Sequence, residues 1–344
     1  MSFDEPQASP APSIDPAEAG EIAADLFGLT ASAIALDGWS DANFRLVTDD
    51  GDFSLKIANP AERAAVVEMQ QLAIEHAVAV DPRLPVPRPI RTRDGSLVES
   101  VEIDGRTCAV RLVTFLGGTT IPSGFSTPLL RSRLGTQSAR LDLALHDFRH
   151  PEQDREFLWD IVQMAGIRAH THHLADDRSE FVSSWLERFY DEIEPRLTGL
   201  PRQVIHSDFN SENVLVDPDD PESITGVIDF ADVIRSPRII EPAVAAAYQC
   251  FGADDPGVVV AELIGAYHSV SPLHGAEIGL VPDLVMARLV QSITIGAWHA
   301  DLHPNNREYL LLNSEPAWKA LVELSRLGTD VIRTAVRDAC AAVG

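Results

Sequence analysis

Hydrophobic and polar positions alternate in short runs through the first third of the chain, which predicts strands there. Two such runs, 43–48 and 53–57, flank the polar segment 49–52 with its glycine, and this order indicates a β-hairpin. Apolar side chains recur at helical spacing over 61–80, and the proline-rich segment 81–89 ends that helix. Two further strands are predicted, over 96–102 and 107–114.

Beyond Gly118 the pattern becomes that of helices. Apolar residues recur at helical spacing in six stretches, 128–147, 155–174, 179–195, 257–270, 280–300 and 316–341. The exception is 203–232, in which short β-like runs alternate with polar loops. A smaller β-rich part followed by a larger helical part predicts an α+β protein with two lobes, which we place at 17–118 and 119–344.

Composition narrows the classes of function. No apolar run is long enough to span a membrane and the N-terminus lacks the order of a secretory signal, so we expect a soluble, cytoplasmic protein. The 52 acidic residues against 27 basic ones give a net charge of −25, which would repel a nucleic-acid backbone or an anionic membrane surface. The three cysteines are far apart and odd in number, as is typical of thiols in a reducing compartment. Residues 1–16, with four prolines among small and acidic residues, are expected to form a disordered tail.

Lysine usage is selective. Lys56 and Lys319 are the two lysines of the chain, and all its other basic residues are arginine. A compact ammonium on a flexible stem differs chemically from a planar guanidinium, so a lysine kept in such a chain indicates a site that needs a point charge. Lys56 lies on the second strand of the predicted hairpin and is the better candidate.

The strongest chemical signal is a polar loop at 206–213, which lies between two apolar runs and is followed by an acidic strand end. Phosphoryl transfer needs a carboxylate at the attacking hydroxyl and oxygen ligands for Mg²⁺ that bridges the phosphates. Asp208 would orient or deprotonate the hydroxyl, while Asn213 and Asp229 would ligate the metal. If Asp208 and Asn213 were only turn and cap residues, the paired spacing would have no explanation.

The loop and the strand behind it resemble the motifs of the kinase-like superfamily of aminoglycoside and choline-type phosphotransferases, which read H-x-D-x-x-x-x-N and then D-F-x. The resemblance implies a bilobal protein-kinase-like fold, with ATP or GTP as donor held by the N-terminal lobe and Mg²⁺ as the metal. It also implies that Lys56, on the third strand, contacts the phosphates and is braced by a glutamate of the following helix. We assign that role to Glu68, with Glu62 and Glu75 as competitors.

The segment expected to cover the phosphates departs from the protein-kinase pattern. Residues 37–43 contain one glycine where G-x-G-x-x-G is usual, so we assign phosphate contacts to Ser40, Asn43 and backbone amides. The chain has no G-x-x-x-x-G-K-[ST], which excludes a P-loop kinase. His206 is expected to brace the catalytic loop, because its adjacency to Ser207 does not provide the geometry of a hydrolase triad.

Stretches outside these motifs, over roughly 33–325, resemble the hydroxylysine kinases of this superfamily. That resemblance implies 5-hydroxylysine or a similar amino alcohol as acceptor, GTP as the donor of the animal members, and a pyridoxal-phosphate phospho-lyase acting on the product. Acids outnumber bases from Asp208 to Glu241, which favours a small cationic or zwitterionic acceptor. We expect Asp232 and Glu241 to contact its ammonium group and Arg288 to contact a carboxylate.

Two alternatives stay open. Another kinase of the same fold, acting on an aminoglycoside, homoserine, choline or an amino sugar, would carry the same donor motifs. A catalytically silent binding protein on a kinase scaffold would be expected to lack the lysine, the base or the metal ligands, and the chain has all of them.

Overall fold

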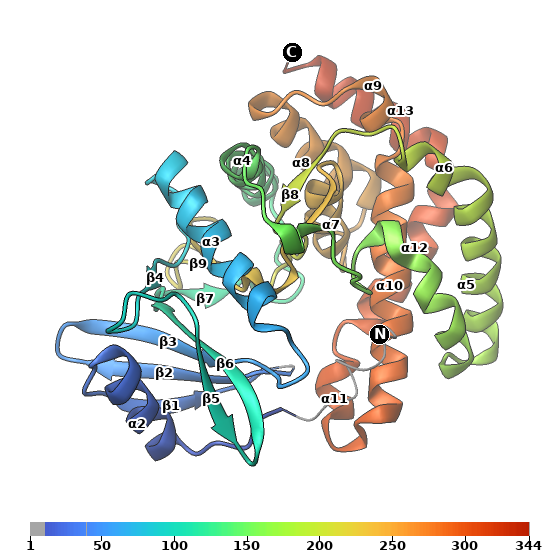
Figure 1. The fold of residues 1–344 in the computed structure, drawn as a ribbon. Coiled ribbons are helices and arrows are strands. Elements are labelled where there is room, and N and C mark those ends of the chain that lie inside the picture. The colour runs from blue at the N-terminus through green and yellow to red at the C-terminus, as the bar shows by residue number, and fades with distance from the viewer. Residues whose placement is uncertain (1–10, 39, 344) are drawn as a thin grey trace. The chain divides into compact units, whose positions relative to one another are not determined.

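The computed structural model describes residues 11–38 and 40–343. By their internal contacts the residues form two compact units, which are described separately (Figure 1). The first unit consists of 1–118 together with 148–153 and 225–231, and the second consists of 119–147, 154–224 and 232–344. The segments 148–153 and 225–231 thus join the β-rich unit, although the sequence boundaries assigned them to the helical part. No helix of the described residues is long and apolar enough to cross a membrane.

An antiparallel sheet forms the centre of the first unit. Its main path runs β1-β2-β3-β6-β4, and β5 pairs with β6. The strands are β1 (Ser32–Leu36), β2 (Ala42–Thr48), β3 (Gly51–Ile57), β4 (Pro89–Ile90), β5 (Glu99–Ile103) and β6 (Arg106–Thr114). The predicted hairpin is present, with Thr48 opposite Gly51. Gly51 has a φ of 126°, a value that a residue with a Cβ rarely adopts, which explains the glycine at this turn.

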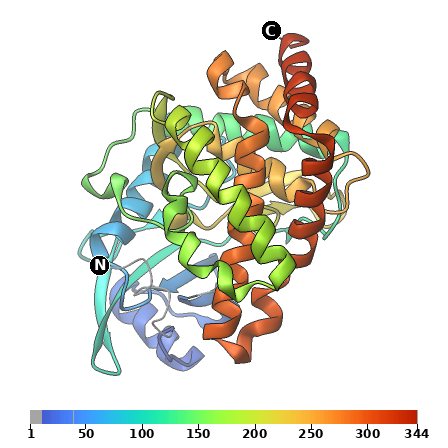
Figure 2. The ribbon, with the colours of Figure 1, turned by 90° about the vertical axis from the view of Figure 1, so that its right-hand side faces the viewer.

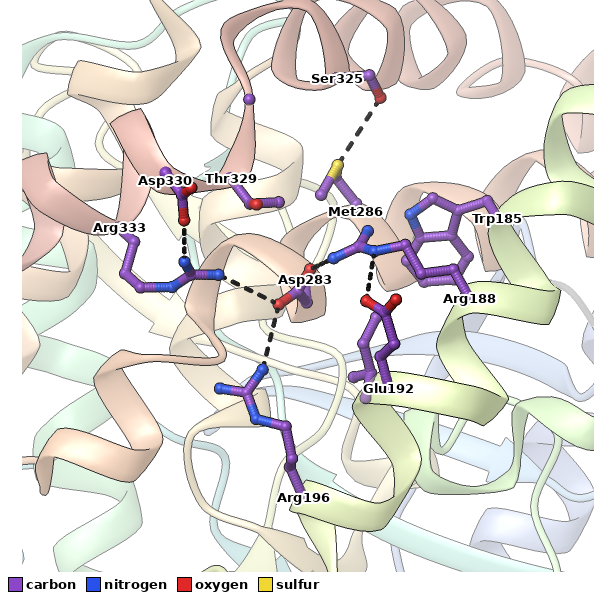
Figure 3. Close-up of a pocket in the computed structure, with 12 residues that line it drawn as sticks. Trp185, Arg188, Glu192, Arg196, Asp283, Met286, Ser325, Thr329, Asp330 and Arg333 are labelled. Atoms are coloured by element: carbon purple, nitrogen blue, oxygen red, sulfur yellow. Dashed lines mark hydrogen bonds and ion pairs between the residues drawn. The ribbon is translucent and has the colours of Figure 1, made fainter.

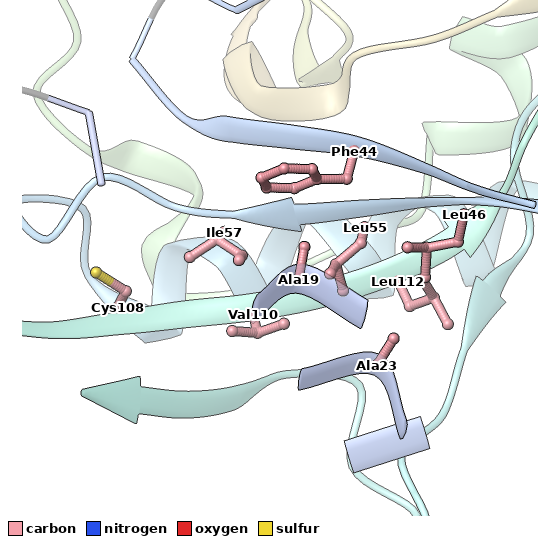
Figure 4. Packing of buried hydrophobic residues seen from close by; sticks show 9 residues of the cluster. All are labelled: Ala19, Ala23, Phe44, Leu46, Leu55, Ile57, Cys108, Val110 and Leu112. Carbon is pink, nitrogen blue, oxygen red and sulfur yellow. The ribbon is translucent and has the colours of Figure 1, made fainter. Parts of the chain in front are cut away.

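Helix α2 (Pro16–Phe27) packs on one face of this sheet. Asp15 caps the first turn of this helix: its Oδ1 accepts from the backbone N–H of Glu18, and the Glu18 side chain accepts from the backbone N–H of Asp15. The ordered chain therefore begins slightly before residue 17, the first residue after the expected tail. Ala19 and Ala23 are fully buried against the inward-facing side chains of β2, β3 and β6 (Figure 4). Those side chains are Phe44, Leu46, Leu55, Ile57, Cys108, Val110 and Leu112. Residues 1–10 of the expected tail lie outside the described residues.

Helix α3 (Ala64–Val80) follows the hairpin, as predicted, and it helps to hold the segment 225–231 in this unit. The buried amide of Gln70 donates to the carbonyl of Ala231 at 3.1 Å. The backbone N–H of Val227, at the end of β10 (Ile224–Val227), donates to the carbonyl of Pro85 at 2.7 Å. These bonds fix the strand end that carries Asp229.

Helices make up most of the second unit, and α10 (Val281–Leu302) runs through it almost entirely buried. In the view of Figure 2, α5, in yellow-green, lies in front of α10, in orange. The other α-helices are α4 (Pro128–Leu145), α5 (Asp176–Arg188), α6 (Glu194–Leu197), α7 (Ile240–Gln249), α8 (Pro256–Val270), α9 (Gly275–Ile278), α11 (Arg307–Leu310), α12 (Ser314–Leu327) and α13 (Thr329–Ala341). Between Arg188 and α6 the chain forms one π-helical turn, η3 (Phe189–Ile193).

Short strands frame the loops of the second unit. β8 (Arg202–Ile205) pairs antiparallel with β11 (Ile234–Pro237), and β9 (Val214–Val216) pairs with β7 (Thr119–Thr120). Short 3₁₀ turns are formed by η1 (Pro151–Asp154), η4 (Phe230–Asp232) and η5 (Pro304–Asn306).

Two helical stretches differ from the sequence expectation. Within the stretch 155–174, only Ile161–His173 is helical, as the 3₁₀ segment η2, which is interrupted by the non-helical backbone of Gln163. The stretch 316–341 is two helices, because Gly328, with a φ of 83°, ends α12 and starts α13.

Candidate active site

The loop between β8 and β9 holds the carboxylate of Asp208 by several donors. Asn210 Nδ2 donates to Oδ1 at 2.8 Å, and Asn213 Nδ2 donates to Oδ2 at 2.6 Å. Arg288 Nη2 also donates to Oδ1. Since each carboxylate oxygen can accept two hydrogen bonds, Oδ1 is saturated and Oδ2 keeps one accepting position. The side chain of Asp208 is partly exposed.

Arg288 reaches this loop from α10 and is buried, with 2% of its side chain exposed. Its guanidinium carbon lies 4.6 Å from the ring centre of Trp159 and 5.7 Å from that of Tyr248. Burial works against its charged form, yet Tyr248, Asp208 and Asp232 hold the Arg288 pKa above its usual value. With so little exposed surface, Arg288 holds the candidate base in this structure, and its expected contact with a substrate carboxylate stays a prediction.

Glu241, in the first turn of α7, is wholly buried below the same loop. Its Oε2 accepts a hydrogen bond of 2.7 Å from the backbone N–H of Ser207, a residue with a φ of 70°. Burial raises the pKa of Glu241 to about 7, and the nearby Asp208 adds to that rise. The expected contact of Glu241 with a substrate ammonium stays a prediction, and in this structure the carboxyl has no exposed surface. It supports the left-handed backbone at Ser207.

His206 and Asn210 complete the support of the loop. The His206 ring is fully buried, and its Nδ1 accepts from the backbone N–H of Asp208 at 3.3 Å. Asn210 Oδ1 accepts from the backbone N–H groups of Glu212 and Asn213, at 2.8 and 3.0 Å. His206 was expected to brace this loop, whereas Asn210 was not among the predicted site residues. The signal for Asn210 was its place two residues after Asp208 in a loop where Asn favours turn geometry.

In the first unit, Lys56 meets Asp229. Lys56 Nζ lies 3.0 Å from Asp229 Oδ1, and both side chains are partly exposed. Asp229 has a φ of 60°, and the backbone N–H of Ala231 also donates to its Oδ1, at 3.3 Å. Lys56, predicted to contact the phosphates, and Asp229, predicted to bind the metal, thus form an ion pair.

The assignment of Glu68 as the brace of Lys56 is not supported. Glu68 lies on the exposed face of α3, while its neighbours Val67 and Met69 are buried. The helix presents its glutamate to solvent because the adjacent positions face the core. The competitor Glu75 is also engaged elsewhere, since it forms an ion pair of 2.7 Å with Arg91.

The segment before β2 is held by side-chain contacts of its own. Asp41 accepts from the guanidinium of Arg111 at 3.2 Å, and Asn59 Nδ2 donates to the carbonyl of Ser40 at 3.3 Å. Asn43 Nδ2 donates to the carbonyl of Asp41 at 3.3 Å. A Cβ at Gly38 would lie 2.2 Å from Asn43 Nδ2, so this close approach requires glycine.

A metal site was assigned to Asn213 and Asp229, which belong to different units. Asn213 uses its amide N–H₂ on Asp208, which leaves its amide oxygen as a possible ligand. Asp229 supplies a partly exposed carboxylate. Within residues 11–38 and 40–343 there is no cluster of three or more His, Cys, Asp or Glu residues arranged for a metal. A carboxylate such as that of Asp229 is the kind of ligand that usually holds Mg²⁺, together with water and the phosphates of the substrate.

Comparison with known proteins adds independent information. The sequence model described as "Phosphotransferase enzyme family" matches residues 30–280. A hydroxylysine kinase of Danio rerio is 30% identical over 336 residues, covering 93% of this chain and 94% of the relative. A homoserine kinase of Methylobacillus flagellatus is 27% identical over 255 residues, covering 72% of this chain and 73% of the relative.

Solved structures bear on the fold. A microcompartment-associated aminopropanol kinase superposes with a TM-score of 0.72 at 19% identity, over 92% of this chain and 99% of that one. An amicoumacin kinase, solved with AMP-PNP and Ca²⁺, gives a TM-score of 0.68 at 15% identity, over 92% and 94%. These likenesses confirm the predicted α+β, protein-kinase-like fold.

Proposed function

Because this chain belongs to the phosphotransferase enzyme family and is a kinase with a hydroxyl acceptor, we propose that it transfers the γ-phosphate of ATP or GTP to a small amino alcohol or hydroxy amino acid. The first candidate acceptor is 5-hydroxylysine. The observation that carries the proposal is the carboxylate of Asp208, oriented by Asn210, Asn213 and Arg288 with one accepting position left on Oδ2.

Asp208 accepts a hydrogen bond from the acceptor hydroxyl and takes up its proton as the oxygen attacks the γ-phosphorus. Arg288 and Asn213 keep the carboxylate turned toward that hydroxyl. Lys56 pairs with the phosphate oxygens of the donor. When bound, Mg²⁺ neutralises phosphate charge, and the residues that would hold it are Asp229 and Asn213.

The choice of acceptor is supported by the relatives. Those called hydroxylysine kinase match nearly the whole chain, whereas those called homoserine kinase match about three quarters of it. Both named acceptors carry a hydroxyl, an ammonium and a carboxylate group. With Glu241 enclosed, Asp232 is our remaining choice for the ammonium partner, since it is only partly buried. A pyridoxal-phosphate phospho-lyase would be the class of enzyme that consumes the product.

A γ-phosphate transfer screen tests this proposal. The purified protein is incubated with Mg²⁺ and either ATP or GTP, and with hydroxylysine, homoserine, choline, an amino sugar or an aminoglycoside, and the phosphorylated product is measured by mass. We expect the highest kcat/KM for hydroxylysine. Turnover of a bulky aminoglycoside or a neutral sugar, with no activity on any hydroxy amino acid, would contradict the proposed acceptor class while leaving the kinase assignment intact.

A further inference from the structure

The second unit contains a cavity of about 440 Å³ that none of the active-site residues described above lines. Its walls come from the segment α5–η3–α6, from the first turns of α10 and from the junction of α12 and α13 (Figure 3). The volume lies in the range of small-molecule sites and exceeds the size of a single small ion.

Three guanidinium groups converge on one carboxylate in this cavity. Asp283, on α10, has no exposed surface, and Arg188 donates to its Oδ1. Arg196 Nη1 and Arg333 Nη2 lie 3.9 and 3.8 Å from its Oδ2, within ion-pair range but beyond hydrogen-bond distance. Figure 3 shows them approaching Asp283 from different sides. Asp283 Oδ2 has no hydrogen-bond partner among the described residues. One buried acid thus lies close to three cations, and the other two of their charges are balanced by Glu192 and Asp330, which also line the cavity.

The remaining acids of the cavity are at its edge. Glu192 pairs with Arg188 four residues before it, and Asp330 pairs with Arg333 three residues after it. The side chains of Glu192 and Asp330 are 66% and 93% exposed. Exposed pairs of this kind within one helical stretch contribute little free energy, so an incoming anion can replace them.

Further donors come from the start of α13. Gly328 occupies the N-cap position and has no side chain to cap the helix. The backbone N–H groups of the first turn therefore lack helical acceptors where Thr329 and Asp330 line the cavity. Thr329 supplies a hydroxyl to this lining, whereas the hydroxyl of Ser325 donates to Met286 Sδ at 3.8 Å. A helix N-terminus, a hydroxyl and guanidinium groups together are the donor set that recognises a phosphoryl group.

We propose that this cavity binds the phosphoryl group of a small phosphomonoester and that its occupancy changes turnover. Arg196 and Arg333 would bind the phosphoryl oxygens. Asp283 and Arg288 lie five residues apart on α10, a rise of about 7.5 Å along the helix. Arg288 donates to Asp208, so a shift of the first turns of α10 changes how the candidate base is held. The binding part of this inference does not depend on the identity of the acceptor.

The test is a calorimetric titration of the full chain with O-phosphoethanolamine, in the presence of a saturating non-hydrolysable nucleotide that occupies the donor site. Inorganic phosphate and succinate are titrated in parallel. We expect saturable binding of the phosphomonoester, weaker binding of phosphate and none of succinate. Arg196→Gln and Arg333→Gln should each weaken the binding about tenfold, because each removes a charge-assisted hydrogen bond. Arg326→Gln, which removes an exposed arginine that does not line the cavity, is the matched control.

Arg196 is suited to this test because its side chain is half exposed and it makes one hydrogen bond, to the carbonyl of Gly279. Its substitution should leave the melting temperature and the kcat measured without phosphomonoester unchanged. The phosphomonoester should alter kcat in the unmodified protein and have no effect on kcat in Arg196→Gln. Lack of saturable binding, or equal binding by the unmodified protein and both cavity variants, would overturn the site. Binding without any change in kcat would overturn the coupling through α10.

Discussion

Replacing Glu241 with glutamine removes a buried charge and keeps an oxygen that accepts from Ser207 N–H. The pKa of Glu241 is raised from 4.5 to about 7 by burial, with a further contribution from Asp208. A difference of this size corresponds to about 3 kcal/mol between the two protonation states. The groups that face Glu241 include the acids Asp142 and Asp208 and the cation of Arg288.

The sign of the pH dependence follows from the raised pKa. Below pH 4.5 the carboxyl is protonated in both the folded and the unfolded state, so it contributes no pH dependence. Between pH 4.5 and about 7 the unfolded state releases the proton while the folded state keeps it, so the free energy of unfolding falls as pH rises. Above about pH 7 the full destabilisation is present.

The assay is chemical denaturation of the protein and of Glu241→Gln at several pH values between 5 and 8. We expect the free energy of unfolding of Glu241→Gln to fall less across this window, by an amount on the order of 3 kcal/mol. Glu323→Gln, a change at an exposed position, is the control and should follow the unmodified protein. Parallel profiles for the protein and Glu241→Gln would refute the reasoning.

Kinetics separate the charge of Glu241 from its role as an acceptor. Glu241→Gln should keep kcat, because an amide oxygen can still accept from Ser207 N–H. Glu241→Ala should lower kcat, because it leaves that buried N–H without a partner at a backbone of left-handed φ. Equal kcat values for the two variants would show that the loop does not need this acceptor.

Asp208→Asn should lower kcat by about 10²–10⁴-fold in a coupled phosphorylation assay, and it should also lower the melting temperature, because Arg288 loses its carboxylate partner. Near-normal phosphorylation would contradict its role as base. Lys56→Met should weaken nucleotide affinity in a titration, while Lys319→Met should not, because Lys319 is an exposed residue of α12. Asp229→Ala should weaken nucleotide binding in the presence of Mg²⁺ far more than in its absence, and equal weakening would refute the metal role. Arg288→Lys should lower kcat more than it raises KM, because an ammonium cannot replace the planar guanidinium next to the rings of Trp159 and Tyr248. A larger rise in KM than fall in kcat would support a substrate-binding role for Arg288.

Local patterns were sufficient to predict the hairpin that carries Lys56 and to single out the loop that carries Asp208. The hairpin that carries Lys56 could be predicted because alternation and a polar turn specify neighbouring strands over a few residues. Asp208 and Asn213 lie five residues apart, and their hydrogen bond closes within a single loop. In such cases the interacting groups are close because they are near in the sequence, so their spacing along the chain is enough to predict the contact.

Charge counting could not decide which ionisable groups reach a ligand. Glu241 belongs to the acidic region that favoured a zwitterionic acceptor, and Arg288 was expected to contact the carboxylate of that acceptor, but both are buried and both contact the loop of Asp208. Their partners lie 34 and 80 residues away in the sequence. Glu68, expected to brace Lys56, lies on the exposed face of α3, because packing sets the rotation of this helix against the core.

The sequence by itself indicated the family, the hairpin of β2 and β3 and the helix that follows it, since each depends on residue types at short spacing. Only the tertiary structure brought Arg188, Arg196 and Arg333 around Asp283, because these residues come from different helices and their spacing shows no periodicity. Burial, the property that turned Glu241 into a support and Arg288 into a partner of Asp208, depends on how distant helices pack. A linear pattern of charges does not contain that information.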